Sequence, residues 1–245
     1  MTTPSRIRID RLLVERGLFD SRAKAQDAIA AGLVKADGKV IGKASDEVAA
    51  DAQIEATPAH PYVSRGALKL IAALDHFQFK PSGRICLDVG ASTGGFTQVL
   101  LERGAAKVYA VDVGTAQLHQ SLRGDARIVS LEQTDIRKLD AANLDPKPDL
   151  VVCDVSFISL RQVLPAALAL AAKPAQLIAL IKPQFEAGRA QLKKGIVRDE
   201  AVRRAVCEDI EGLVKSLGGD VIGVVPSPIE GGDGNVEYLI GAAVS

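Results

Sequence analysis

The sequence has few residues that form cross-links or stacking surfaces. It contains no tryptophan, only nine phenylalanines and tyrosines together, and three cysteines, Cys86, Cys153 and Cys207. These cysteines are isolated and odd in number, and the three histidines are equally scattered. The pattern predicts neither a disulfide framework nor a metal site, and it fits a reducing compartment.

Long apolar runs are also absent. The longest, residues 163–172, is interrupted by Pro165 and is far shorter than the roughly 18–20 residues that span a bilayer. The first residues interleave Arg6, Arg8 and Arg11 with apolar side chains and contain no apolar core of a secretory signal. We therefore expect a cytoplasmic, monomeric protein that does not bind membranes.

Charge shows no excess of either sign, because 30 Lys and Arg balance 30 Asp and Glu. With 47% hydrophobic residues, the chain is predicted to fold, and the overall basic character of many nucleic-acid binders is missing. Local charge differs, since residues 1–43 hold nine basic and five acidic residues, whereas residues 44–62 hold four acidic and no basic ones. Any binding of nucleic acid is expected to depend on the first of these segments.

The first sixty residues predict a small α+β domain. Ser21 is a favourable N-cap, and Asp37-Gly38 between two short β-type runs favours a type I′ turn. The predicted elements are two short helices ending near Gly17 and Gly32, a hairpin of residues 33–36 and 39–41, and a strand at 53–56. The proline-rich segment 57–62 indicates a boundary, so we expect a domain at 1–59, a linker at 60–63 and a second domain at 64–245.

The second domain alternates strands and helices, which predicts an α/β fold with a mostly parallel sheet of seven strands. Strands are predicted at 84–88, 107–111, 127–130, 149–153, 176–181, 220–225 and 236–243. Helices are predicted at about 64–78, 95–103, 115–123, 160–172 and 199–217.

A loop of small residues follows the first of these strands and opens a helix. Gly90, Ser92, Gly94 and Gly95 would let a ligand approach the backbone and the amide donors at the start of the helix. An ordinary strand-to-helix turn is the simpler alternative. A nicotinamide site is disfavoured, because its G-x-G-x-x-G motif would need glycine where Ser92 stands, and the phosphate-loop motif of nucleotide triphosphatases is absent.

Charged residues follow successive strands. Asp112 comes 24 residues after Asp88 and could accept hydrogen bonds from the ribose of an adenosine, while Asp135 could meet the adenine amino group. Asp154 and Lys182 end the next two strands and are expected to face the crevice at the carboxyl edge of the sheet. Each alone could be a solvated residue or a helix cap, but their repetition favours an adenosine cofactor.

Asp88, Asp154 and Lys182 lie in motifs that resemble those of the TlyA family, also called hemolysin A. The motifs are DVGASTGGFT at 88–97, CDVSFIS at 153–159, IKPQFE at 181–186, KGIVRD at 194–199, GNVEYL at 234–239, and RIDRLLVERG at 8–17 with SRAKA at 21–25. The resemblance covers nearly the whole chain. Members of the family are FtsJ-like RNA ribose methyltransferases with a Rossmann-like class I methyltransferase sheet, preceded by an RNA-binding domain like that of ribosomal protein S4.

The resemblance implies roles for individual residues. Its catalytic K-D-K-E tetrad corresponds to Lys69, Asp154, Lys182 and Glu237. Its S-adenosylmethionine site would comprise Asp88, Gly90, Ser92, Gly94, Gly95, Phe96, Asp112 and Asp135. Its RNA contacts would comprise Arg6, Arg8, Ser21, Arg22, Lys24 and Arg65, and a solvated helix face is the less favoured alternative for the front arginines. The linker departs from the family, since HPYV at 60–63 replaces a segment of the Arg-x-Trp-Val type.

The implied activity is 2′-O-methylation of ribosomal RNA, with cytidine as the suggested base. The sulfonium donor is already activated, so the chain must supply positioning and deprotonation of a ribose hydroxyl, and no metal is required. Lys182 is the expected general base, assisted by Lys69 as a second cation, with Asp154 holding Lys182 and Glu237 orienting Lys69. The alternatives are a membrane-active hemolysin, for which no segment is found, and a non-catalytic ribosome-assembly protein, which would not need the tetrad.

Overall fold

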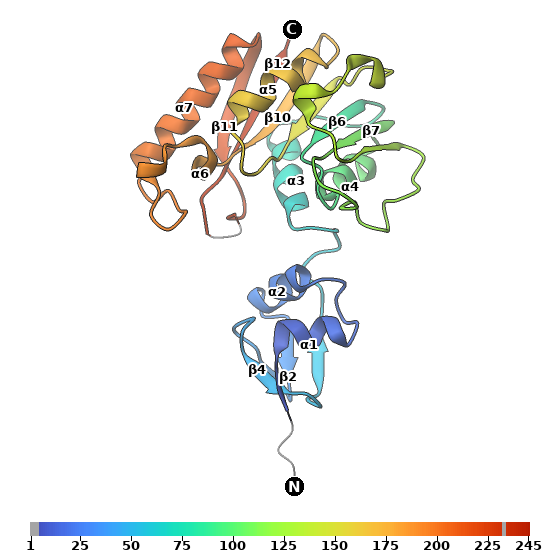
Figure 1. Ribbon diagram of the computed structural model, residues 1–245, viewed down its shortest axis with the longest axis vertical. Helices are drawn as coiled ribbons and strands as arrows, with labels where there is room; N and C mark the ends of the chain where they lie inside the picture. The colour runs from blue at the N-terminus through green and yellow to red at the C-terminus, as the bar shows by residue number, and fades with distance from the viewer. Residues whose placement is uncertain (1–4, 232–233) are drawn as a thin grey trace. The chain divides into compact units, whose positions relative to one another are not determined.

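The chain forms two compact units, Met1–Arg65 and Gly66–Ser245 (Figure 1). The computed structural model describes residues 5–231 and 234–245, so the first four residues of the expected 1–59 domain lie outside it. The expected linker at 60–63 falls at the end of the first unit.

The first unit is the α+β fold predicted from the sequence. It comprises β1 (Arg6–Arg8), α1 (Ile9–Glu15), α2 (Arg22–Ala30), β2 (Val34–Ala36), β3 (Lys39–Val40), β4 (Glu47–Ala49) and β5 (Ile54–Ala56). Strands β3, β2 and β5 form one small antiparallel sheet, and β1 pairs with β4. Asp37 and Gly38 have φ angles of 49° and 76°, as the predicted type I′ turn requires.

The two helices are short and depend on tertiary packing. Ser21 caps α2, since its hydroxyl accepts a hydrogen bond from the amide of Lys24. Helices of seven and nine residues are too short to be stable in water alone, so burial of their apolar faces must stabilise them. The buried cluster contains Ile9, Leu13, Phe19, Ala25, Ala28, Ile29, Val34, Ala36, Ile41 and Ala52.

A buried carboxylate on α1 organises the basic side chains of this unit. Asp10 is fully buried and accepts hydrogen bonds from the Arg8 guanidinium at 3.0 and 3.1 Å, from Arg22 at 2.7 Å and from Gln26 at 3.0 Å. Burial raises the pKa of Asp10, but these hydrogen bonds outweigh burial and hold the pKa well below its usual range. Asp10 therefore stays ionised and fixes two arginines.

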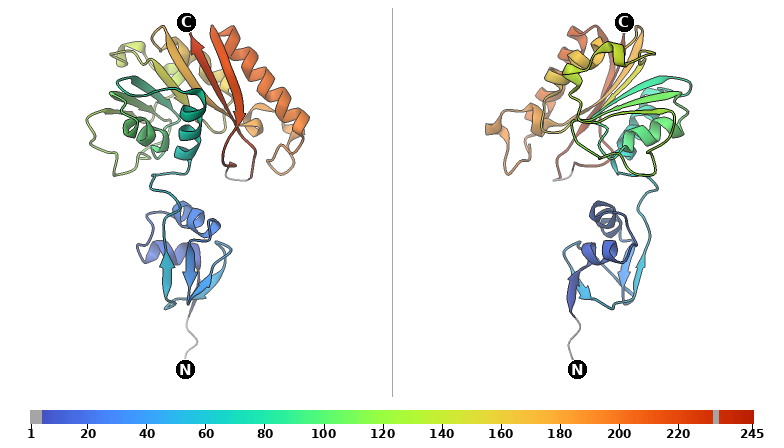
Figure 2. Two further views of the ribbon diagram at one scale, coloured as in Figure 1. Left: turned by 180° about the vertical axis from the view of Figure 1, so that it is seen from behind. Right: turned by 45° about the vertical axis from the view of Figure 1, so that its right-hand side comes forward.

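The second unit is the predicted α/β fold, with a seven-stranded sheet between helices (Figures 1 and 2). Its strands are β6 (Ile85–Val89), β7 (Lys107–Val111), β8 (Ile128–Leu131), β9 (Leu150–Cys153), β10 (Ala175–Ile181), β11 (Gly219–Pro226) and β12 (Tyr238–Val244). Their order is β11-β12-β10-β9-β6-β7-β8; β12 is antiparallel to both β11 and β10, and the pairs from β10 to β8 are parallel.

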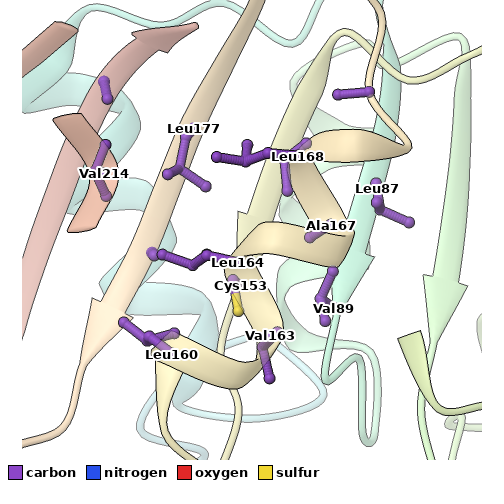
Figure 3. Packing of buried hydrophobic residues seen from close by; sticks show 14 of the residues in the cluster. Leu87, Val89, Cys153, Leu160, Val163, Leu164, Ala167, Leu168, Leu177 and Val214 are labelled. Carbon is purple, nitrogen blue, oxygen red and sulfur yellow. The ribbon is translucent and has the colours of Figure 1, made fainter. Parts of the chain in front are cut away.

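Helices cover both faces of this sheet. They are α3 (Gly66–Phe77), α4 (Gly95–Glu102), α5 (Leu160–Ala169), α6 (Pro183–Glu186) and α7 (Glu200–Ser216), with 3₁₀ turns η1 (Ile136–Lys138), η2 (Ala141–Asn143) and η3 (Arg189–Gln191). Helices α3 and α4 pack together, as do α5 and α7. Figure 3 shows α5 placing Leu160, Val163, Leu164 and Leu168 against the sheet, where they form part of the main hydrophobic core.

The helix predicted at 115–123 is wrong. This segment is a loop, because the carboxylate of Glu132 accepts hydrogen bonds from the amides of Ala116, Gln117 and Leu118 at 2.5–3.1 Å. The guanidinium of Arg123 donates to the carbonyl oxygens of Ala116 and Leu118. Side chains thus satisfy backbone groups that a helix would have paired internally.

No helix within residues 5–231 and 234–245 is long and apolar enough to cross a membrane. The longest described there, α7, has 17 residues and carries charged side chains along its length.

We expect Asp10→Asn to destabilise the first unit by about 2 kcal/mol near neutral pH, because it weakens charge-assisted hydrogen bonds to a buried group. The contribution is present above the unfolded pKa near 4 and is lost as the pH falls toward the lower folded pKa, so the difference from the parent should shrink at pH 3. Hydrogen exchange of α1 and α2 amides in the full chain measures this. Asp51→Asn, at an exposed position of the same unit, is the control. Equal protection in both variants would contradict the role of Asp10.

Candidate active site

The carboxyl ends of five parallel strands share one edge of the sheet, and the candidate site lies there. In the register, Val89 of β6 is opposite Cys153 of β9, and Cys153 is opposite Ala179 of β10. Strand β6 has β7 on one side and β9 on the other, so the order of successive strands reverses at this point, where open α/β sheets bind ligands. The residues that follow these strands are therefore brought together.

A pocket of about 540 Å³ opens at this edge, large enough for a nucleoside-sized ligand. Of the predicted cofactor residues, Gly90, Ser92, Asp112 and Asp135 line it, and Asp154 lines it as well. Asp88, Gly94, Gly95 and Phe96 do not line it. Gly94 belongs to the same loop and Gly95 begins α4, and Asp88 and Phe96 are buried.

Two glycines of the loop are required by its geometry. Gly90 has φ of 83°, and a Cβ there would lie 2.4 Å from the carbonyl oxygen of Asp154. Gly94 has φ of 93°, and a Cβ would lie 2.4 Å from a methyl carbon of Leu122. Because glycine has no Cβ, the loop can pass close to the end of β9 and to the 115–124 loop.

Asp112 connects the two loops that border the pocket. One carboxylate oxygen accepts a hydrogen bond from the amide of Ser92 at 2.8 Å, and the other accepts one from Gly114 at 2.7 Å. Each oxygen has a second lone pair, so hydroxyl donors of a ligand could still bind.

Asp135 is differently engaged. Its oxygens accept hydrogen bonds from the backbone and guanidinium of Arg137, and these bonds lower the pKa of Asp135 to about 2. An adenine amino group at Asp135 would therefore share this carboxylate with Arg137.

Asp88 is fully buried under the glycine loop. Thr97 donates a hydrogen bond from its hydroxyl to Oδ2 at 2.6 Å, while Oδ1 has no partner within the described residues. Burial raises the pKa of Asp88 to about 7, and the hydrogen bond from Thr97 opposes this shift. An unpartnered buried oxygen below a ligand pocket is suited to a donor or a positive charge supplied from the pocket.

The four tetrad residues form two ion pairs. Lys182 follows β10 and places Nζ 2.6 Å from Oδ1 of Asp154, with side chains 10% and 20% exposed. Lys69 of α3 places Nζ 2.5 Å from Oε2 of Glu237, and both side chains are buried. Charges removed from water to this degree are costly unless paired, so each pair holds its members in place.

The two pairs are adjacent through strand pairing. Ile181 of β10 is opposite Tyr238 of β12 in the last pair of this antiparallel ladder. Lys182 follows Ile181 and Glu237 precedes Tyr238, so both lie just beyond the same end of the ladder. The side-chain amide of Gln184 donates to Oε1 of Glu237 at 3.3 Å, and Lys182 donates to the hydroxyl of Ser156 at 2.8 Å. Two neighbouring polar groups thus lie at this edge, one joining α3 to Glu237 and Gln184 and the other joining Lys182 to Asp154 and Ser156 at the pocket.

The predicted RNA-binding residues lie in the first unit, and each makes a contact within it. Arg6 donates to the carbonyl oxygen of Glu47, Arg8 and Arg22 bind Asp10, and Lys24 pairs with Asp20. Ser21 caps α2, and Arg65 lies 3.9 Å from Asp27. The side chains of Arg8 and Arg22 remain 47% and 56% exposed, so their outer faces are open to a ligand.

Several site residues were not identified from the sequence. The hydroxyl of Thr97 contacts Asp88 and that of Ser156 contacts Lys182, and a single sequence contains no motif that would predict either contact. Phe157 lies at the pocket, is 91% exposed and has φ of 64°, with its ring centroid 5.0 Å from that of Phe185. The sequence does place this phenylalanine shortly after Asp154 at a strand end, but phenylalanine is usually buried, so the sequence alone did not predict an exposed ring at the pocket.

The chemistry of the site fits an adenosine-containing sulfonium cofactor. The loop provides backbone donors, Asp112 provides acceptors, and the carboxylate of Asp154 provides negative charge for a cation. In the part of the chain that is described, no group of three or more His, Cys, Asp or Glu residues could hold a metal ion.

Comparison with known families identifies two matches. Residues 62–244 match the FtsJ-like methyltransferase family, and residues 7–54 match the S4 domain.

Individual relatives are similar over nearly the whole chain. A 16S/23S rRNA (cytidine-2′-O)-methyltransferase TlyA from Mycobacterium tuberculosis strain H37Rv is 46% identical over 240 residues, covering 96% of this chain and 89% of that protein. Hemolysin A of Brachyspira hyodysenteriae is 39% identical, covering 95% and 98%. A solved structure of a "putative hemolysin" from Streptococcus thermophilus superposes with a TM-score of 0.79 at 40% identity, covering 99% of this chain and 90% of that one.

We expect Asp88→Asn to remove a pH dependence of stability. Asp88 ionises near pH 4 in the unfolded chain and near 7 when folded, so the folded state binds more protons between these values and its stability falls as the pH rises. The contribution is about 4 kcal/mol at most. Urea unfolding between pH 5 and 8 should show a smaller decline for the variant than for the parent. Asp75→Asn, at an exposed carboxylate of α3, is the control, and parallel curves for parent and Asp88→Asn would refute the assignment.

Proposed function

Because the chain belongs to the FtsJ-like methyltransferase family, we propose that it transfers a methyl group from S-adenosylmethionine to a ribose 2′-hydroxyl of ribosomal RNA, at cytidine. Residues 62–244 carry the family match, and the relative that is 46% identical is named for this reaction. The observation that carries the proposal is the Lys182–Asp154 pair at the rim of a pocket formed by a glycine loop.

S-adenosylmethionine supplies an electrophilic methyl group on a sulfonium. Gly90 and Ser92 border the pocket for it, and Asp112 accepts hydrogen bonds from its ribose. Asp154 lines the pocket and provides negative charge that favours a cation, while Asp88 offers Oδ1, which has no partner among the described residues, as an acceptor. Asp135 contributes to the adenine end while it remains bound to Arg137.

Lys182 accepts the proton of the ribose hydroxyl. To act as the base, Lys182 must first release its own proton. The carboxylate of Asp154, 2.6 Å from Nζ, holds the amine at a fixed position. General bases of this kind contribute about 10²–10⁴ in rate.

Lys69 and Glu237 support the base. Glu237 orients Lys69, and Gln184 joins this pair to the segment that follows Lys182. The exposed ring of Phe157 at the pocket is suited to contact the target base by stacking.

The first unit provides RNA affinity. We assign residues 1–59 to this role and residues 60–63 to the linker, with phosphate contacts from Arg6, Arg8, Ser21, Arg22, Lys24 and Arg65. Phosphate contacts give affinity and recognise shape rather than sequence. A ribosomal substrate places the enzyme in the cytoplasm, where one chain is expected to act alone.

We expect Asp112→Ala to weaken S-adenosylmethionine binding by about tenfold or more, because both ribose acceptors are lost. RNA affinity should change little, since the basic residues belong to the other unit. Isothermal calorimetry with the cofactor, together with filter binding of rRNA, measures both. Asp140→Ala, which removes the cap of η2 outside the pocket, is the matched control. Equal cofactor affinity in the two variants would remove Asp112 from the site.

We expect Lys182→Arg to lose methyl transfer by about 10²–10⁴, because arginine keeps the charge but cannot release its proton in the working pH range. Lys182→Met, which keeps length without charge, should also be inactive. Single-turnover incorporation of labelled methyl into ribosomal subunits measures the rate, and cofactor and RNA affinities should stay within a few-fold. Lys147→Arg, at an exposed position, is the control. A Lys182→Arg rate of one tenth of the parent or more would exclude the lysine base.

A further inference from the structure

The segment that follows α6 carries an unusual concentration of positive charge. Residues 187–198, here called the cationic loop, hold four basic residues and no acidic one, in a chain whose net charge is zero. The four are Arg189, Lys193, Lys194 and Arg198, and all are exposed.

These cations differ from most others on the second unit. Arg84, Arg103 and Arg127, for example, pair with acids nearby. Within the described part of the chain, none of the four loop cations takes part in an ion pair or donates a side-chain hydrogen bond. Their charge is therefore available to an anionic partner.

The backbone of the loop presents this charge at a tight turn. Lys193 and Ile196 form an antiparallel bridge, and the two residues between them, Lys194 and Gly195, have φ of 53° and 80°. Such a turn favours glycine, asparagine or aspartate, and lysine adopts this conformation only unfavourably. Lys194 nevertheless lies at the tip of this turn, where its side chain is exposed.

A buried asparagine fixes the loop to the catalytic edge. Asn235 is 3% exposed, accepts a hydrogen bond from the amide of Val197 at 3.3 Å and donates one to the carbonyl oxygen of Gly195 at 3.2 Å. Asn235 lies two residues before Glu237, and the loop begins five residues after Lys182. Figure 1 shows the loop, in orange after α6, at the same edge as the segment before β12.

We propose that the cationic loop is an RNA-phosphate contact surface of the catalytic unit, and that Asn235 positions it relative to Lys182 and Glu237. An RNA backbone is favoured over a protein partner because the exposed loop residues offer cations without an exposed apolar anchor, while Val197 is turned inward. This surface would hold the RNA strand near the base independently of the first unit. The inference rests on the proposed function for its substrate.

The test compares Lys193→Gln/Lys194→Gln with the parent and with Lys80→Gln/Lys147→Gln. The control pair removes the same charge from exposed positions that precede β6 and β9, at the opposite edge of the sheet. Binding of each full-length protein to purified unmethylated ribosomal subunits and to deproteinised rRNA is measured between 50 and 200 mM salt, alongside methyl incorporation.

We expect the loop variant to bind both probes about tenfold more weakly near 0.15 M salt, and its slope of log affinity against log salt to be smaller by about 1.4–1.8 for two lost contacts. The control pair should match the parent. A loop variant equal to the control would overturn the proposal, and so would a loss seen only with intact subunits and without a change of slope, which would indicate a ribosomal protein. Absence of methyl transfer by the parent would instead refute the proposed function, while the binding slopes would still decide the loop.

Asn235→Ala tests the positioning step. It should reproduce the smaller salt slope, and adding it to the two lysine substitutions should cause no further reduction, because the contacts are already lost. A purely structural role would leave the slope unchanged or give additive losses, and either result would exclude positioning by Asn235.

Discussion

The register of the central strands is the constraint on which the site depends. Strands β6, β9 and β10 are parallel and aligned so that Gly90, Asp154 and Lys182 emerge at one edge, and β12 adds Glu237 beside Lys182. Because side chains alternate across a sheet, a shift of one residue would turn each strand's residues to the opposite face. The apolar core on both faces prevents such a shift, so packing far from the pocket determines which charged groups meet.

The paired charges are not explained by stability. Lys69, Glu237, Lys182 and Asp154 are all removed largely from water, and a buried ion pair contributes little net stability compared with apolar residues of similar size. Loss of one member leaves the other unpaired, which is strongly unfavourable. The arrangement is therefore better understood as a means of holding two ammonium groups at defined positions beside a pocket.

Much of this architecture could be predicted from the sequence. Short apolar runs ending in Asp88, Asp112 and Asp154 predicted the strands because burial on both faces requires them. The segment 115–123 could not be predicted, since its conformation depends on Glu132, which belongs to a later strand end and acts through the fold.

The contacts of individual side chains also could not be predicted from the sequence. Nothing in the sequence distinguishes Asp10 from other acidic residues of a helix, yet it accepts hydrogen bonds from Arg8 of β1 and from two residues of α2. Three-dimensional packing likewise leaves Asp88 Oδ1 without a partner among the described residues and exposes Phe157.

The shared carboxylate of Asp10 has a thermodynamic consequence for recognition. Arg8 and Arg22 are held by it before any RNA binds, so the loss of side-chain entropy, up to about 2 kcal/mol for each arginine, occurs when the unit folds. Binding then needs less ordering, and the spacing of two guanidinium groups is fixed in advance. A ligand whose phosphates match that spacing gains affinity without sequence-specific contacts. If Arg8 and Arg22 contact RNA as proposed, folding of this unit and selection of RNA shape depend on the same three residues.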